Sequence, residues 1–335
     1  MFDLFREASQ SLIAELEHLG DYQSLQAGQE LIREGKIDGA IYVLKDGVLN
    51  VTTSSAAGEQ KCLAELEPGS VVGEMSWLEN RPAVASVVAT TVASVLTLPY
   101  EHLEQLEVSN SDLGAEWQQL LARKLALQIS SQNAWIHRFS EASKDIEPLR
   151  KVLVLFAGLE DQDVNILSNL GVLKRIPPDD VLIRQGEAVD SLYLILAGEA
   201  EIYVEIDGVD RQVGSSRRGE LLGELTLLLN DERGATASVH TATGTEVLEI
   251  NKAKLLQHFE LHPQMARRFY RSLNCMISQR SRDQLLSRQL AAESQRAEKN
   301  DLDDELDLFQ LGGINRAGQR FSSLCQKFQS SQDMS

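Results

Sequence analysis

Four blocks of sequence occur twice in this chain, in the same order and about 150 residues apart. The matched pairs are LIREG (31–35) with LIRQG (182–186), IYVLKDG (41–47) with LYLILAG (192–198), VGEMS (72–76) with LGELT (222–226), and RPAVASV (81–87) with RGATASV (233–239). A period of this length indicates a duplicated domain and not a short solenoid repeat. Function therefore has to be inferred by comparing which motif residues each copy of the domain has retained and which it has lost.

The amino-acid composition argues against certain classes of binding partner. The chain has 335 residues, enough for two domains of ordinary size, and a net charge of −18. A nucleic-acid partner needs an excess of Lys and Arg to neutralise phosphates, so this charge argues against one, and against an anionic membrane surface. The first residues lack the apolar core of a signal peptide, and no apolar stretch is long enough to span a bilayer. We expect a cytoplasmic protein with no membrane insertion.

Hydrophobic periodicity predicts the order of the domains. Residues 22–100 and 172–250 alternate apolar and polar positions between Gly, Asp, Asn and Pro, which is typical of strands and turns, and Lys45–Gly47 is a hairpin signal. Helical spacing occurs at Asp3–His18, within 101–142, in Asp145–Leu170, in 252–298 and in 315–329. The predicted segments are an N-terminal helix (1–20), a first β-domain (21–104), a helical connector (105–145), a helical lead-in (146–170), a second β-domain (171–252), a long helix (253–300), and an acidic break with a tail (301–335).

The repeated motifs resemble those of the cyclic-nucleotide-binding domain family. They are the turn glycines Gly47 and Gly198, the Gly-Glu pairs at 73–74 and 223–224, and the Ala-Ser-Val segments at 85–87 and 237–239. The resemblance covers residues 20–140 and 148–290. It implies a mainly β fold with flanking helices, in which each copy is an eight-stranded β-roll (a jelly roll) followed by long helices. It also implies cyclic AMP or cyclic GMP as a possible ligand, and no other cofactor.

The chemistry of the family's pocket accounts for these residues. The short helix after Gly-Glu offers free backbone N–H groups to a cyclic phosphate, and the glycine allows close approach of the backbone. By the resemblance, the Glu accepts a hydrogen bond from the ribose 2′-hydroxyl and an Arg further along pairs with the phosphate.

The chain departs from the family pattern at that Arg. Alignment on Ala-Ser-Val places Ala83 in the first copy and Ala235 in the second copy where the family has Arg. Counting forward from Gly73 reaches Ala83 again, whereas counting forward from Gly223 reaches Arg233, because the second copy has two extra residues. Neither way of counting places an Arg in the first pocket. In the second pocket, counting from Gly223 gives Arg233, whereas alignment on Ala-Ser-Val gives Ala235.

These counts define the candidate ligand-binding residues. In the second copy they are Gly223, Glu224, Leu225, Arg233, Ala235 and Thr236. In the first copy, which we expect to be degenerate and closed to nucleotide, they are Gly73, Glu74, Met75, Arg81, Ala83 and Val84.

Each of these residues also has an explanation without a ligand. A carboxylate at a helix start, such as Glu74 or Glu224, is stabilising by itself, and Arg81 and Arg233 could be surface turn residues. Trp77 either fills the space where a phosphate would lie or packs in the core.

No catalytic constellation or metal site is predicted, because the chain has no GxSxG, HExxH or Walker glycine run. Asp161–Asn165 superficially suggests a calcium loop but better resembles a helix start. Seven arginines make the helix after the second β-domain basic, and they are Arg267, Arg268, Arg271, Arg280, Arg282, Arg288 and Arg296. They could contact DNA, but packing against an acidic body, either the protein's own or a partner's, is the favoured interpretation.

Two functional hypotheses stay open. One is a signalling sensor, in which cyclic nucleotide binds the second repeat and moves its C-terminal helix. The other is a ligand-free scaffold that uses both β-rolls and the long helices for assembly with an unknown protein partner. We also expect a homodimer, formed through apolar stripes on the long helices, unless each stripe packs on its own β-roll. The stripe residues are Leu120, Leu121, Leu125, Ile129, Leu273, Met276, Ile277, Leu285 and Leu286.

Overall fold

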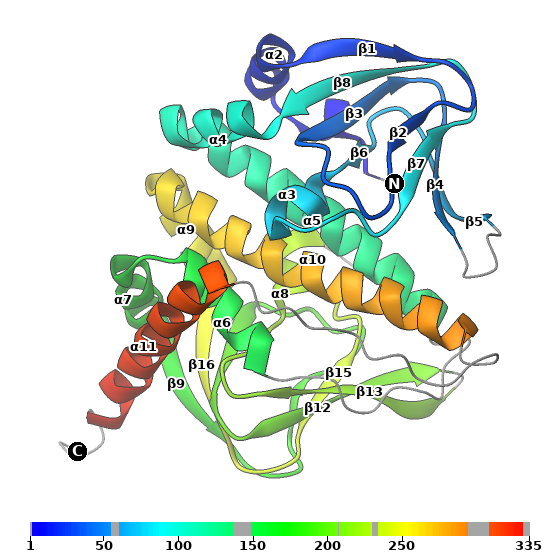
Figure 1. The fold of residues 1–335 in the computed structure, drawn as a ribbon. Coiled ribbons are helices and arrows are strands. Elements are labelled where there is room, and N and C mark those ends of the chain that lie inside the picture. Colours follow the sequence, from blue (N-terminus) through cyan, green and yellow to red (C-terminus); the bar gives the residue numbers. More distant parts are fainter. Residues whose placement is uncertain are drawn as a thin grey trace. The chain divides into compact units, whose positions relative to one another are not determined.

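The computed structural model describes residues 2–54, 60–136, 149–206, 208–229, 234–293 and 308–330. The chain divides into two compact units, which Figure 1 shows in ribbon form. Unit 1 comprises Met1–Ile129 and Ile277–Asp304, and unit 2 comprises Ser130–Met276 and Glu305–Ser335. Each unit contains one copy of the repeat.

Unit 1 is built on two four-stranded antiparallel sheets with the orders β1-β8-β3-β6 and β2-β7-β4-β5. The strands are β1 (Asp21–Leu25), β2 (Glu30–Ile32), β3 (Ala40–Asp46), β4 (Leu49–Ser54), β5 (Gln60–Leu66), β6 (Val71–Val72), β7 (Ser86–Ala89) and β8 (Ala93–Pro99). Side chains from both sheets, including those of Leu25, Leu44, Val87 and Val95, form one apolar core. The period-two pattern of the sequence is the cause, since alternate residues of a strand face the same side.

Unit 2 repeats this architecture, with sheets in the orders β9-β16-β11-β14 and β10-β15-β12-β13. Its strands are β9 (Gly171–Ile176), β10 (Val181–Ile183), β11 (Ser191–Ala197), β12 (Glu199–Ile206), β13 (Val209–Arg217), β14 (Leu221–Leu222), β15 (Ser238–Thr241) and β16 (Thr245–Asn251). The two strand orders correspond one to one. The predicted fold class, two eight-stranded β-rolls with flanking helices, is confirmed.

The predicted hairpin at Lys45–Gly47 is wrong. Strand β3 pairs with β6 and β8, whereas β4 pairs with β5 and β7, so the chain changes sheet at this turn. Gly47 has φ 90°, and a Cβ there would lie 2.5 Å from the carbonyl oxygen of Val92. The glycine is needed for a tight crossing between sheets, and local turn residues alone cannot distinguish such a crossing from a hairpin.

The helices of unit 1 are α1 (Leu4–Glu7), α2 (Gln10–Leu19), α3 (Glu74–Glu79), α4 (Tyr100–Ser109) and α5 (Ser111–Ile136), of which α5 belongs to unit 1 as far as Ile129. The single helix predicted for Asp3–His18 is therefore two helices. Its interruption has a local cause: the hydroxyl of Ser9 accepts a hydrogen bond from the Leu12 N–H and caps α2, while Ala8 is extended.

The helices of unit 2 are α6 (Leu149–Gly158), α7 (Asp161–Leu170), α8 (Glu224–Leu229), α9 (Lys252–Leu261), α10 (Pro263–Glu293) and α11 (Leu308–Ser330), and the part of α10 from Ile277 onward belongs to unit 1. The predicted long helix after the second β-domain is thus α9 and α10. They separate at Pro263, which is well suited to the first turn of a helix because it lacks an N–H. The acidic segment Asp301–Asp307 lies outside the described residues.

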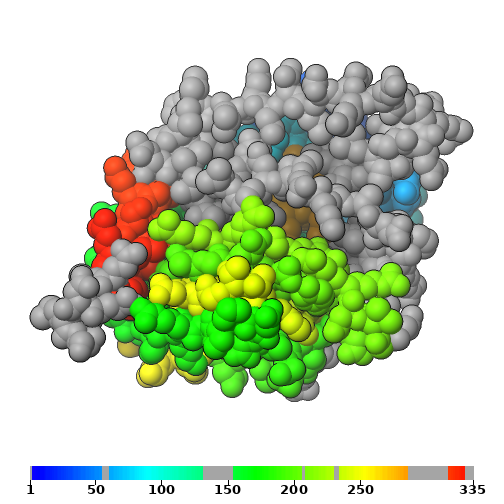
Figure 2. Space-filling view, turned by 90° about the horizontal axis from the view of Figure 1, so that it is seen from below, coloured from blue at the N-terminus to red at the C-terminus, as the bar shows by residue number. Residues whose placement is uncertain are grey.

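The last helix is longer than the one predicted at 315–329 and packs on the helices of its own unit. The ring centroids of Phe156 on α6 and Phe321 on α11 are 5.2 Å apart, and Ala317 and Leu324 are buried. Figure 2 shows α11, in red, at the edge of the green and yellow surface of the second β-roll.

Most of the described side chains in the apolar stripes on α5 and α10 are buried within one chain. All four residues of the α5 stripe are buried, as are Leu273, Met276 and Ile277, whereas Leu285 is half-buried and the side chain of Leu286 lies outside the described residues. This burial agrees with the alternative that the stripes pack inside the molecule. Self-association stays a prediction.

Candidate functional site

Each Gly-Glu pair sits where a two-residue strand turns into a short helix. Gly73 follows β6 with φ 90° and Gly223 follows β14 with φ 83°. A Cβ would lie 2.8 Å from the Ala40 carbonyl oxygen in the first copy, and 2.9 Å from that of Ser191 in the second. Both glycines are therefore required by a close approach of two backbone segments, whether or not a ligand binds.

In the first copy the carboxylate of this pair has a partner inside the protein. The side chain of Glu74 is 3% exposed and forms an ion pair with the ammonium of Lys124 on α5. Lys124 also donates to Gln128 Oε1 over 3.1 Å. The hydroxyl of Tyr100 donates to the Gly73 carbonyl oxygen over 3.3 Å, and burial raises the pKa of Tyr100. The carboxylate that would accept a ribose hydroxyl is thus engaged by a cation of the protein itself.

In the second copy a lysine takes the place of Tyr100. Lys252 is the first residue of α9, as Tyr100 is of α4, and its buried ammonium donates to the Val189 carbonyl oxygen and to the Thr226 hydroxyl on α8. Burial lowers the pKa of Lys252 to about 8, although the nearby carboxylates of Glu224 and Asp190 favour its charged form. Glu224 is itself buried at the start of α8. The second Gly-Glu segment therefore has a buried cation beside it.

The backbone shows which residues of the two turns before β7 and β15 are equivalent. The N–H of Gly35 donates to Ala83 O and the N–H of Ala83 donates to Lys36 O, both over 2.8 Å. In the second copy the N–H of Gly186 donates to Ala235 O and the N–H of Ala235 donates to Glu187 O, again over 2.8 Å. Ala83 and Ala235 are therefore equivalent in the two copies, and the two extra residues of the second copy precede Gly234.

The other candidate residues are distributed around these segments. Arg81 is exposed, Met75 and Val84 are half-buried, Leu225 is buried and Thr236 is exposed. Trp77 is buried, with its ring 6.4 Å from that of Tyr100. Arg233 lies outside the described residues.

Sequence reasoning missed Lys124 and Lys252. A signal for Lys124 existed, because it falls on the same helical face as Leu120, Leu121 and Gln128, so a charged residue interrupts a predicted apolar stripe. The alignment of Lys252 with Tyr100, at the first helical position after the last strand, was also visible in the sequence.

A shallow depression of about 260 Å³ lies on the first β-roll. Its lining includes two acidic side chains, Glu30 and Asp38, and two basic ones, Arg33 and Lys36. Arg33 is paired with Glu30 over 2.7 Å, and burial raises the pKa of Asp38. The charges balance, so this surface has no excess of positive charge with which to select a phosphate.

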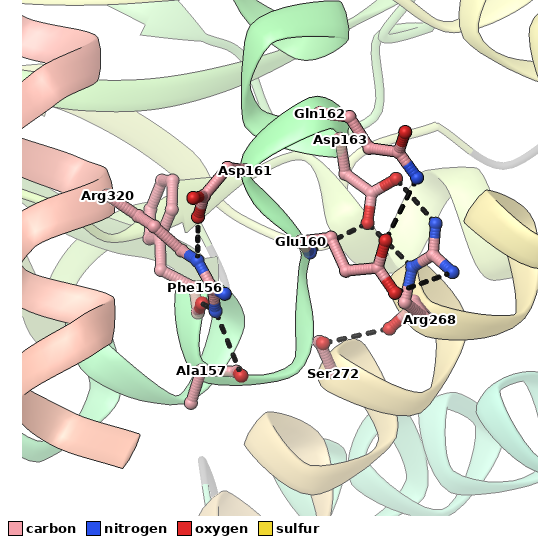
Figure 3. Close-up of polar contacts among 9 residues, drawn as sticks. All are labelled: Phe156, Ala157, Glu160, Asp161, Gln162, Asp163, Arg268, Ser272 and Arg320. Atoms are coloured by element: carbon pink, nitrogen blue, oxygen red, sulfur yellow. Dashed lines mark hydrogen bonds and ion pairs between the residues drawn. The ribbon is translucent and has the colours of Figure 1, made fainter. Parts of the chain in front are cut away.

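The turn between α6 and α7 is held by two arginines, as Figure 3 shows. Arg268 of α10 makes two hydrogen bonds to the buried carboxylate of Asp163, over 2.7 and 2.8 Å, and Arg320 of α11 binds Asp161 over 2.7 Å. Asp161 is the first residue of α7, so the interpretation of this segment as a helix start is confirmed. At Arg268 the basic helix packs against the protein's own acidic groups.

Among the described residues, no group of three or more His, Cys, Asp and Glu side chains could hold a metal ion.

Comparison with known proteins identifies the family. Residues 22–110 and 173–262, more than half of the chain, match the cyclic nucleotide-binding domain. The chain therefore belongs to this family and carries two copies of its domain, as the motifs indicated.

Relatives of this chain include the cAMP-dependent protein kinase regulatory subunit of Blastocladiella emersonii, which is 24% identical over 70% of this chain and 51% of its own length. The cGMP-dependent protein kinase egl-4 of Caenorhabditis briggsae is 24% identical over 75% of this chain and 29% of its own length. The chain thus spans about half, or less, of these relatives. Among solved structures, the regulatory domain of Toxoplasma gondii PKA with cAMP has 19% identity and a TM-score of 0.30, covering 78% of this chain and 88% of that one. Within the described residues, no helix is long and apolar enough to cross a membrane.

Proposed function

We propose that this protein is a non-catalytic regulator whose second repeat binds cyclic AMP or cyclic GMP and signals through the helices that follow it, while the first repeat does not bind nucleotide. The names of its relatives, which are cyclic-nucleotide-dependent kinases and their regulatory subunits, support the ligand class. The observation that carries the proposal is the contrast between the two Gly-Glu segments. Tyr100, an uncharged residue, begins α4 beside the first segment, whereas Lys252, a buried cation, begins α9 beside the second.

A cyclic phosphate brings one negative charge that needs a positive counterpart. Both repeats have alanine at the position aligned with the family's Arg, Ala83 and Ala235, and the turn arginine of the first repeat, Arg81, is exposed. The second repeat has two candidate cations in its sequence, Arg233 and Lys252. Arg233 is the candidate for direct contact with the phosphate, and Lys252 is a positioning residue that holds α8 through Thr226.

Isothermal titration of the whole chain with cyclic AMP and with cyclic GMP tests this proposal. We expect one site per chain. Arg233→Ala should weaken binding about tenfold or more, because a charge-assisted contact is lost, and Glu224→Gln should weaken it similarly. The matched controls are Arg81→Ala and Glu74→Gln, the same changes at the equivalent positions of the first repeat, which should leave the affinity unchanged.

The alternative function is a ligand-free scaffold, in which both β-rolls and the long helices serve assembly. It predicts no heat and no thermal stabilisation with either nucleotide at millimolar concentration. Sedimentation at micromolar concentration tests the homodimer that either function allows. A monomer of 37.1 kDa would leave only the intramolecular packing of the helical stripes.

A further inference from the structure

The end of α3 that is remote from Gly73 carries a second buried carboxylate, Glu79. Its side chain is only 1% exposed. At the same position of α8 the second repeat has Leu229, which is also buried. A carboxylate in the place of a leucine needs partners, because burying an unpaired charge is strongly unfavourable.

Those partners come from the part of α10 that belongs to unit 1. Arg282 Nε lies 2.5 Å from Glu79 Oε2, and the Ser278 hydroxyl donates to Glu79 Oε1. A second nitrogen of Arg282, Nη1, donates to the Pro82 carbonyl oxygen over 2.9 Å. Residues four apart lie on the same face of a helix, so one face of α10 contacts both the end of α3 and the turn that follows it.

The start of α3 is connected to the same helix through α5. Glu74 pairs with Lys124, Lys124 donates to Gln128, and Gln128 Nε2 donates to Ser281 Oγ over 3.1 Å. Contacts at both ends thus tie α3 to α5 and α10. A six-residue helix has little stability of its own, so these contacts, together with the burial of Trp77 and Leu78, hold α3 in place.

We propose that α3 of the first repeat is a docking site for the distal part of α10, with Arg282 as the anchoring residue. We call Glu79, Ser278 and Arg282 the α3 clamp. The clamp holds the former phosphate-binding segment in place without nucleotide. Its anchor is a buried charge pair, so a change at Arg282 should loosen the end of α3 at Glu79 while the β-roll stays folded. This inference does not depend on whether the second repeat binds nucleotide.

Hydrogen exchange of the whole chain without ligand, read by mass spectrometry, tests the clamp. Arg282→Lys keeps the charge but loses the planar fork that reaches both Glu79 and Pro82, and Ser278→Ala removes one hydroxyl. We expect peptides covering residues 73–84 to exchange about tenfold faster in Arg282→Lys and somewhat faster in Ser278→Ala. Peptides from β3 and β8 should exchange as in the unaltered protein. The matched control is Arg33→Lys, which alters an exposed ion pair of the same unit and should change nothing.

The clamp would be refuted if α3 exchanged at the unaltered rate in both variants, or if exchange rose equally in β8. Ser278→Ala keeps the test available should Arg282→Lys fail to fold. Saturating cyclic AMP or cyclic GMP should not slow exchange in α3 of the unaltered protein. Slower exchange there would show that the first repeat takes nucleotide, which contradicts the inference, whereas a failure of the second repeat to bind would leave the clamp result as it stands.

Discussion

The two repeats share a backbone and differ in how they hold one short helix. Both have the same strand order and the same left-handed glycine before α3 or α8. In the first repeat α3 has a carboxylate at each end, paired with Lys124 and with Arg282. In the second repeat α8 begins at Glu224, contacts Lys252 through Thr226, and ends at an apolar residue, Leu229.

Two repeats with the same backbone therefore need not have the same binding site. The glycines are required in both copies by close packing of the chain, so their presence says nothing about a ligand. The charges beside the two segments do distinguish the copies, because the first has Tyr100 where the second has the buried ammonium of Lys252. Four predictions test this comparison.

Making α3 resemble α8 should have the largest effect. Glu79→Leu leaves Arg282 buried without its carboxylate, and we expect it to lower the free energy of unfolding by about 4 kcal/mol. Urea denaturation measures this. The double variant Glu79→Leu with Arg282→Met should recover most of the loss, since an apolar pair can replace a buried ion pair. Equal stability of the single and double variants would mean that Arg282 finds another partner.

The crossings between sheets should respond equally in both repeats. Gly47→Ala and Gly198→Ala would each place a Cβ within 2.8 Å of backbone atoms at φ 90°, and each should cost about 3 kcal/mol by thermal or urea unfolding. Gly28→Ala is the matched control. Gly28 also has a positive φ, but no atom lies near its Cβ position, so the cost should be about 1 kcal/mol. A large difference between the Gly47 and Gly198 variants would show that the two crossings are not equivalent.

Below pH 10, the ordinary pKa of tyrosine, the lysine of the second repeat should make stability depend on pH whereas the tyrosine of the first should not. The folded-state pKa of Lys252 is about 8, below its ordinary value of 10.5, so between these values the unfolded chain binds more protons. Stability from this group therefore rises with pH across that window, with a slope of up to about 1.4 kcal/mol per pH unit. The measurement is the unfolding free energy of the unaltered protein minus that of Lys252→Met, from pH 7 to 10.5. A difference that is flat with pH would show that the ammonium is not buried in solution.

The smallest effect is expected from one exposed ion pair in each repeat. Arg33 and Glu30 lie 2.7 Å apart, and Arg175 and Glu246 lie 2.9 Å apart, with both arginine side chains more than half exposed. Arg33→Ala and Arg175→Ala should each change stability by less than about 1 kcal/mol, and less still in high salt. A change as large as that of Glu79→Leu would remove the distinction between the buried clamp and ordinary surface pairs.

Much of this architecture was readable from local patterns. The repeated blocks predicted two copies, and the alternation in 22–100 and 172–250 located strands that run over Asp21–Pro99 and Gly171–Asn251. The interpretation of Asp161 as a helix start was right because capping is a local effect. The hairpin at Lys45–Gly47 was wrong because a glycine turn looks the same whether the next strand pairs back or crosses to another sheet.

The sequence by itself determined the duplication, the strand-and-helix order and the family. These depend on spacing and residue type, which are properties of short segments. Only the tertiary structure decided that Glu74 pairs with Lys124 and that Arg282, one of six arginines on α10, pairs with Glu79. These ion pairs join residues some 50 or 200 positions apart in the sequence. Their formation depends on which helices pack together, and a pattern within a short segment carries no information about that packing.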